Sequence, residues 1–224
     1  MAGKTSDEHS EFVFHRGFYL VELVGKKAGS LKEFLKYIKT IDEQSVFQHM
    51  YHTLLQHHFV IPEYYNDFAH WLGKELHEDV LAERFAYVGL SEYGDINSVR
   101  QKLVEILEER MKQKSSGKVS VPDDRAFHFV KSNVVVMPTK YRAKNIDEFL
   151  GCLDKIDGST LFYHFFSSRL KYSKKKEKYV DDFSRWFNRI GHSEIADKIS
   201  SVCLYGYTLE GIRKEIRKII KEAQ

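Results

Sequence analysis

The chain has 224 residues, a formal net charge of +3, 42% apolar and 30% charged residues, and so has the composition of a globular protein. No run of about 18 apolar residues occurs, which excludes a membrane span, and the polar segment 1–11 lacks the apolar core of a signal peptide. Cys152 and Cys203 do not occupy matching places in the repeat described next, so we expect buried free thiols in a cytoplasmic protein rather than a disulfide framework.

The sequence repeats itself. Shifted by 115 positions, residues 12–72 align with residues 127–187 without a gap, and sixteen of the sixty-one positions are identical. A repeat of this length indicates one supersecondary unit built twice. The identities include two phenylalanine pairs, a histidine pair, an aspartate pair and a tryptophan pair: Phe34/Phe149, Phe68/Phe183, His49/His164, Asp67/Asp182 and Trp71/Trp186.

Each repeat opens with a predicted strand. Alternating aromatic residues begin both copies, at residues 12–14 and 127–129, and β-branched residues follow at 134–136. Such a composition is typical of strands, here with a bend expected near Gly17 or Asn133. A lone strand leaves its backbone groups unpaired, so we expect the strands of the two repeats to pair with each other.

About five helices should follow in each repeat. Capping boxes at 30–33 and 145–148 start the first helix and account for the matched glutamates Glu33 and Glu148. Asp42 and Asp157 should cap a second helix, which runs through Leu55 in the first repeat. A third is expected from Pro62, a fourth over residues 79–90, and a fifth after the matched caps Asp95 and Thr208.

These patterns predict a mostly helical α+β protein of two tandem pseudo-symmetric repeats related by an approximate two-fold axis. The expected parts are a polar tail at 1–11, repeat 1 at 12–112, an exposed and mobile linker at 113–125, and repeat 2 at 126–224. Residues 1–113 carry a net charge of −5 and residues 114–224 carry +8. Either the two lobes complement each other, or the second meets an anionic partner.

The run Asn66–Trp71, followed by residues 81–84 and by Val99 and Arg100, resembles a bacterial and archaeal family of unknown function. The Ser45–His49 element belongs to the same pattern, and residues 195–198 repeat the 81–84 element loosely. Members of that family sometimes lie near sugar-metabolism and glycosyltransferase genes, so the resemblance implies an association with carbohydrate metabolism. It supplies no catalytic residues.

The matched polar residues that caps do not explain are the candidate site. His49 and His164 could act as general bases oriented by Asp67 and Asp182. The alternative is a buried histidine–aspartate hydrogen bond that joins two helices, and we favour it because a packing device repeats with the fold whereas a catalytic site seldom does.

Ligand-binding candidates are Arg100 and Arg213, which suit a phosphate or carboxylate, and Trp71 and Trp186, which could stack on a sugar or base. Helix-to-helix ion pairs and core packing are the structural alternatives for these two pairs. No metal site is expected, because the histidines near His49 have no counterparts in the second repeat and no tight ligand motif occurs. No cofactor is expected either.

The sequence therefore favours a protein of unknown function that is a non-catalytic protein-interaction or regulatory module. Phosphate-binding loops, nucleophile elbows and paired metal motifs are absent, which argues against common enzyme classes. The alternative is a small-molecule binder or enzyme that uses the cleft between the repeats. A third hypothesis is nucleic-acid binding through the basic run that includes 174–178. We expect a protein partner, with a homodimer left open, and neither membrane nor nucleic acid.

Overall fold

The structure, a computed structural model, describes residues 11–56, 59, 63–89, 95–113, 120–172, 177–202 and 207–224. The protein is mostly helical with one two-stranded sheet, as the repeat predicted. In chain order the elements are β1 (Phe12–Ala28), α1 (Leu31–Ile38), α2 (Glu43–Tyr51), α3 (Thr53–Gln56), α4 (Asp67–Lys74), α5 (Asp79–Tyr87), α7 (Ile96–Met111), η1 (Asp123–Arg125), β2 (Phe127–Ala143), α8 (Ile146–Leu153), α9 (Gly158–Phe162), the π-helix η2 (Tyr163–Ser167), α10 (Ser168–Tyr172), α11 (Asp182–Arg189), α12 (Ser193–Ser200) and α13 (Leu209–Glu222). None of the helices in the described ranges is long and apolar enough to cross a membrane.

The strands of the two repeats pair with each other, which confirms that prediction. Lys131 forms an ion pair with Glu22 at 2.8 Å, and the Thr139 hydroxyl donates to the Phe14 carbonyl at 2.8 Å. Residue numbers thus rise along β1 while they fall along β2, so the pair is antiparallel. The expected bend near Gly17 or Asn133 interrupts neither strand; within β1 the left-handed conformation lies at Gly25, with φ of +72°.

The predicted caps are present. The Glu33 amide donates to Ser30 Oγ at 3.3 Å, and the Glu148 amide donates to Asn145 Oδ1 at 2.9 Å. Both glutamates reach back to an amide one residue before the cap, at Gly29 and Lys144. These hydrogen bonds satisfy helix-terminal N–H groups and give the matched glutamates a structural role.

Three helix boundaries differ from the prediction. The second helix of the first repeat ends at Tyr51 rather than continuing to Leu55, and the short helix α3 follows it. The third begins at Asp67, because the side chain of Asn66 accepts the Ala69 amide at 2.8 Å and caps it there. Pro62, where this helix was expected to start, lies outside the described residues. The helix expected over residues 79–90 ends earlier, at Tyr87, because the backbone of Val88 is extended.

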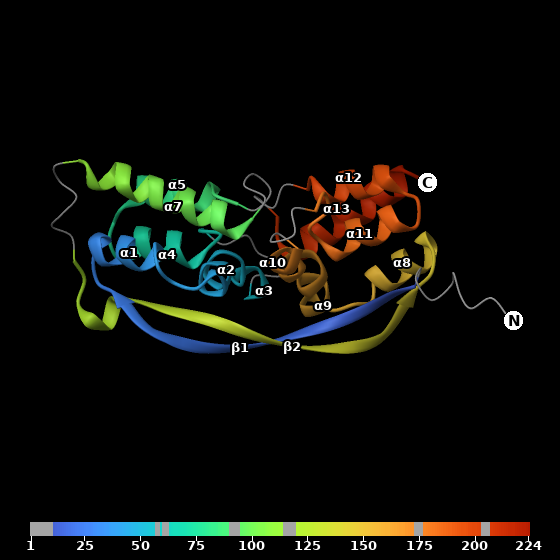
Figure 1. Cartoon of the computed structure of the whole chain (residues 1–224), viewed down its shortest axis with the longest axis horizontal. Coiled ribbons are helices and arrows are strands. Elements are labelled where there is room, and N and C mark those ends of the chain that lie inside the picture. Colours follow the sequence, from blue (N-terminus) through green and yellow to red (C-terminus); the bar gives the residue numbers. More distant parts are fainter. Residues whose placement is uncertain are drawn as a thin grey trace, which may run out of the picture. The chain divides into compact units, whose positions relative to one another are not determined.

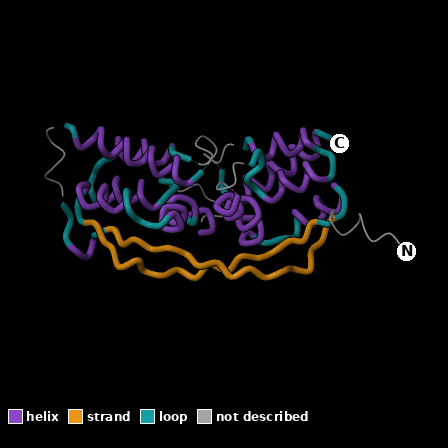
Figure 2. Tube along the Cα trace, viewed as in Figure 1, coloured by secondary structure: helices purple, strands orange, loops and turns teal. Residues whose placement is uncertain are grey.

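The chain forms two compact units, and each contains parts of both strands. Unit 1 comprises the described residues of Met1–Phe18, Val134–Cys203 and Tyr207–Gln224, and unit 2 comprises those of Tyr19–Asn133. The first part of β1 therefore belongs with the helices of the second repeat, and the first part of β2 with the helices of the first. In each unit the helices lie on one face of the strands, and no described element covers the other face (Figures 1 and 2).

The core of unit 2 is a cluster of aromatic rings. Phe34 from α1 is fully buried and lies between the strand residues Phe127 and Phe129, with ring centroids 5.5 and 5.8 Å away. Trp71 from α4 closes the cluster at 5.1 Å from Phe34. First-repeat helices thus bury second-repeat strand residues.

Unit 1 repeats the arrangement with the roles of the repeats reversed. Phe149 from α8 lies 5.6 and 5.4 Å from Phe12 and Phe14 of β1, and its ring stacks on Trp186 of α11 at 5.2 Å. Each of these residues matches one in the unit 2 cluster in the 115-residue repeat. Packed aromatic pairs contribute roughly 0.5–1.5 kcal/mol each beyond the burial of their area.

The second part of the expected linker forms hydrogen bonds to the first repeat, and its mobility stays a prediction. The Val121 amide donates to the Gly29 carbonyl at 2.8 Å, and the Arg125 carbonyl accepts the Trp71 Nε1–H at 2.9 Å. Residues 114–119 lie outside the described ranges.

Because each unit borrows a strand segment from the other repeat, we expect Phe129→Ala to loosen the helices of the first repeat. Truncation of a buried phenylalanine costs about 3–5 kcal/mol. Hydrogen–deuterium exchange should show faster exchange in α1, α2 and α4 than in α8 and α11. Phe14→Ala, its counterpart, is the matched control and should give the reverse pattern; loosening of the mutated residue's own repeat in both variants would contradict the crossed arrangement.

Candidate functional site

His49 connects two helices of the first repeat to the strand of the second. It lies buried on α2, where Nδ1 is 2.9 Å from Asp67 Oδ2 on α4. Its Nε2 accepts the backbone N–H of Val130 on β2 at 2.9 Å. An acceptor at Nε2 places the ring proton on Nδ1, so the neutral imidazole donates to the carboxylate.

His164 repeats this geometry in unit 1. Its Nδ1 is 2.7 Å from Asp182 Oδ2 on α11, and its Nε2 accepts the backbone N–H of His15 on β1 at 2.7 Å. His15 and Val130 are themselves counterparts in the 115-residue shift. The two histidines therefore hold the same backbone position of the opposite strand, and we call each contact a histidine clamp.

The clamps limit what the histidines can do chemically. A general base needs a free ring nitrogen within reach of a substrate proton. In both clamps one nitrogen is bonded to a carboxylate and the other to a backbone N–H. This geometry favours the structural interpretation of the catalytic candidates His49, His164, Asp67 and Asp182.

Burial sets the protonation state of His164. Desolvation lowers the pKa of His164 from its ordinary value of 6.5, and the hydrogen bond to Asp182 opposes that effect. The neutral form, which can accept at Nε2, is thereby favoured in the folded protein. The ring belongs to the π-helix η2, whose counterpart in the first repeat is the last turn of α2 and His52, which follows it.

The tryptophans predicted as ligand platforms lie in the cores. Trp71 and Trp186 are 5% and 1% exposed, and both rings pack on the phenylalanine of the first helix of their repeat. A stacking platform needs an open ring face, so the core interpretation accounts for both residues.

The two arginine candidates differ in their surroundings. Arg213 donates through Nε and Nη2 to the carboxylate of Glu210 at 2.7 and 3.0 Å, and through Nη1 to the Leu153 carbonyl. These contacts tie α13 to the end of α8. Arg100 on α7 is partly buried, and its Nε has no hydrogen-bond partner in the described part of the chain.

Sequence reasoning missed a buried ion pair in unit 1. Arg169 and Asp181 are both buried, with Arg169 Nη2 3.8 Å from Asp181 Oδ2, and Leu54 and Asn66 stand at these places in the first repeat. Burial raises the pKa of Asp181, and Arg169 acts against that rise. The sequence does contain a sign of this pair, because the second repeat has an arginine and an aspartate where the first has Leu54 and Asn66.

The remaining chemistry-bearing groups form no metal site. No three of the histidine, cysteine, aspartate and glutamate residues in the described ranges converge as metal ligands. Cys152 is a free thiol of intermediate exposure, less buried than expected, and its Sγ lies 3.2 Å from the Arg142 carbonyl. Cys203 lies outside the described residues.

Three surface hollows can be described. One of about 310 Å³ opens beside the second clamp and is lined by His15, Lys171 and Asp182 among others. Another of about 390 Å³ lies at the start of α5, and a third of about 580 Å³ lies along α11 and α12. The third is the largest of these.

The fold and the clamps define a protein of two repeats that exchange strands and carry paired structural histidines. The chain belongs to the family of unknown function DUF5752, whose pattern it matches over residues 9–221, in agreement with the resemblance found in the sequence.

A solved structure, that of OrfY from Thermoproteus tenax, is similar to the chain over 96% of each protein, with 28% sequence identity and a TM-score of 0.82. No curated protein matches the chain. The comparisons thus give a family and a fold without a reaction.

The second clamp predicts a pH dependence of stability. Because the folded state lowers the pKa of His164, the unfolded chain binds more protons once the pH falls below about 6.5, and this share of the stability is lost with acidification. We expect His164→Gln to lower the free energy of unfolding by about 1–3 kcal/mol at neutral pH.

The same variant should show a smaller fall in melting temperature between pH 7.5 and 5.5 than the wild type, measured by circular dichroism. His70→Gln, at an exposed position of α4, serves as the control and should keep the wild-type slope. An unchanged slope in His164→Gln would exclude His164 as the group responsible.

Proposed function

We propose that this protein is a non-catalytic protein-interaction module whose partner binds the open edge of β1. The observation that carries the proposal is the exposure of three apolar residues on that strand. Leu20, Val21 and Leu23 are 62%, 53% and 71% exposed. Clustered apolar side chains that stay in water are typical of interaction sites.

The backbone of β1 supports the same proposal. In a two-stranded sheet each strand has one neighbour, so each also has an edge with unpaired N–H and C=O groups. Natural sheets protect such edges with proline, charges or bulges. β2 carries Pro138 at the position that matches Leu23, whereas β1 has no proline. At this position β1 therefore keeps a backbone N–H that β2 lacks.

The proposed occupant is an extended segment of another protein that adds as a third strand along residues 19–24. In such β-augmentation, backbone hydrogen bonds provide affinity and alternate side chains provide specificity. Arg16 lies at one end of this edge and pairs with Asp157. Lys26 and Lys27 lie at the other end, where Lys27 pairs with Asp123. Antiparallel pairing with a second copy would still bring Arg16 of one copy near Lys26 and Lys27 of the other, so a foreign segment with an apolar centre and an acidic residue beside Lys26 fits better.

The clamp geometry supports the non-catalytic part of the proposal, because it engages both ring nitrogens of the candidate bases. The alternatives of the sequence analysis have less support. Of the basic run invoked for nucleic acid, 174–176 lie outside the described residues, and Lys178 forms an ion pair with Asp197 at 2.6 Å. The association with carbohydrate metabolism stays a prediction from the family resemblance.

Leu23→Lys should abolish partner binding, because a charged side chain on an edge strand opposes strand addition. The measurement is cross-linking of the purified chain in an extract of its source organism, with the captured proteins identified by mass spectrometry. Val80→Lys changes a 75% exposed valine on α5 and is the matched control. We expect one protein to be captured by the wild type and Val80→Lys and lost with Leu23→Lys.

The captured protein, once purified, should slow hydrogen exchange of the amides of residues 19–24. Recovery of the same proteins by all three baits would reject the β1 edge as the docking site. If sedimentation instead shows that the wild type is a dimer and Leu23→Lys a monomer, the occupant is a second copy and the proposed foreign partner is wrong.

A further inference from the structure

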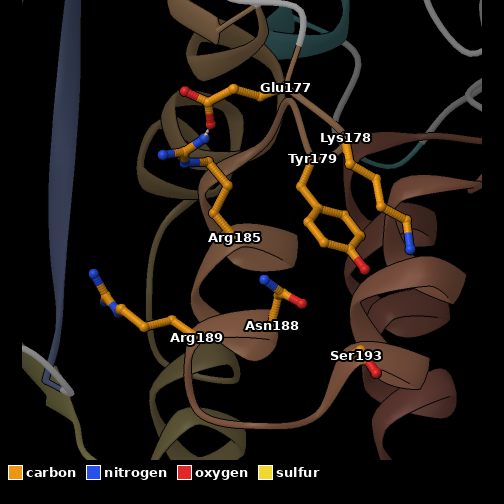
Figure 3. Close-up of a pocket in the computed structure, with 7 residues that line it drawn as sticks. All are labelled: Glu177, Lys178, Tyr179, Arg185, Asn188, Arg189 and Ser193. Atoms are coloured by element: carbon orange, nitrogen blue, oxygen red, sulfur yellow. Dashed lines mark ion pairs between the residues drawn. The ribbon is translucent and has the colours of Figure 1, made fainter.

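The hollow of about 580 Å³ in unit 1 lies between α11, α12 and the segment that precedes α11. Its lining residues include Lys178, Tyr179, Arg185, Asn188, Arg189 and Ser193. Figure 3 shows Lys178 and Tyr179 descending from one segment and Arg185, Asn188 and Arg189 projecting from α11, with Ser193 at the start of α12. The volume is within the range of about 300–1,000 Å³ that small-molecule sites occupy.

The corresponding place in the first repeat is filled by a tyrosine. Gly73 of α4 lies against Tyr64, and a Cβ added to Gly73 would lie 2.4 Å from the Tyr64 hydroxyl. In the second repeat Asn188 stands at the position of Gly73. Its side chain excludes that tyrosine placement, and Tyr179 instead donates its hydroxyl to Asp197 at 2.7 Å. The exchange of glycine for asparagine thus opens the space beside α11.

One of the two charges at the same place is also reversed. In the first repeat Lys74 of α4 forms an ion pair with Glu63 at 2.6 Å. The counterparts in the second repeat are Arg189 and Lys178, so two cations stand where a cation and a carboxylate pair. The second repeat has kept the cation and lost the anion that partnered it.

We propose that the hollow binds a small phosphorylated molecule, whose phosphate takes the place that the Glu63 carboxylate occupies in the first repeat. Arg189 supplies a positive charge that no carboxylate neutralises, and Lys178 adds a second that it shares with Asp197; a guanidinium suits the oxygens of a phosphate. The Asn188 amide and the Ser193 hydroxyl line the same hollow and supply hydrogen bonds to the polar remainder of the ligand.

The neighbouring charges single out Arg189. Glu177 pairs with Arg185, and Asp197 pairs with Lys178 at 2.6 Å, so both these cations have carboxylate partners. Arg189 is exposed and forms no ion pair with any residue in the described ranges. In Figure 3 its side chain extends free of the other labelled residues, and an exposed side chain changes rotamer within nanoseconds, so it can turn toward a ligand.

The test is titration of the full chain with inorganic phosphate, followed by isothermal calorimetry and by chemical shifts of the α11 and α12 amides. We expect saturable binding that Arg189→Gln weakens at least about tenfold, as loss of one charge-assisted contact implies. Lys74→Gln, at the matched position of the first repeat, should leave phosphate binding unchanged. Lys178→Glu restores the first-repeat carboxylate and should abolish binding while the melting temperature reports that the chain stays folded.

Equal weakening by Arg189→Gln and Lys74→Gln would show general attraction to a basic protein and overturn the proposed site. Absence of saturable phosphate binding to the wild type would also overturn it. Acetate is the comparison ligand: binding of acetate as tight as that of phosphate would replace the proposed phosphate by a carboxylate and contradict the ligand class.

Discussion

The histidine clamp is the contact on which the rest of this structure depends. A buried imidazole joins a carboxylate on one helix to a backbone N–H on a strand that comes from the other repeat. Without that nitrogen the half-buried N–H would lose its partner beside an aromatic cluster, and an unpaired buried donor costs roughly 1–3 kcal/mol at most. Because both copies use the same geometry, the clamp links each set of helices to a strand segment that its own repeat does not supply.

Strand exchange explains why the aromatic pattern is conserved between the two halves of one chain. Phe34 and Phe149 each pack on two phenylalanines from the opposite repeat, so neither repeat could alter its strand alone without disturbing the helices of the other. The constraint acts on the core positions only. It leaves the outer surface of α11 and the edges of the strands free to diverge, and those are the places where the repeats differ in charge and in protection.

Divergence between two copies of one scaffold provides an internal comparison. At matching positions the second repeat has proline for leucine, asparagine for glycine and lysine for glutamate, and each of these differences is small by itself. Because the fold of the two repeats is the same, these differences give each repeat its own surface: a strand edge without proline on β1 and a polar hollow beside α11. The two surfaces use different physical means, apolar strand pairing in one and charge in the other, so a single chain has room for two kinds of contact.

The sequence by itself determined the duplication, the strand-then-helices order and the helix caps, because local hydrogen bonding and hydrophobic spacing act between residues close in the chain. It also paired His49 with Asp67 as an alternative, since both recur. Only the tertiary structure decided that Val130 and His15 complete the clamps, and that Asn188 and Lys178 face a shared hollow. The clamp contacts join residues far apart in sequence, and the hollow depends on how α11 and α12 pack; no local pattern encodes either.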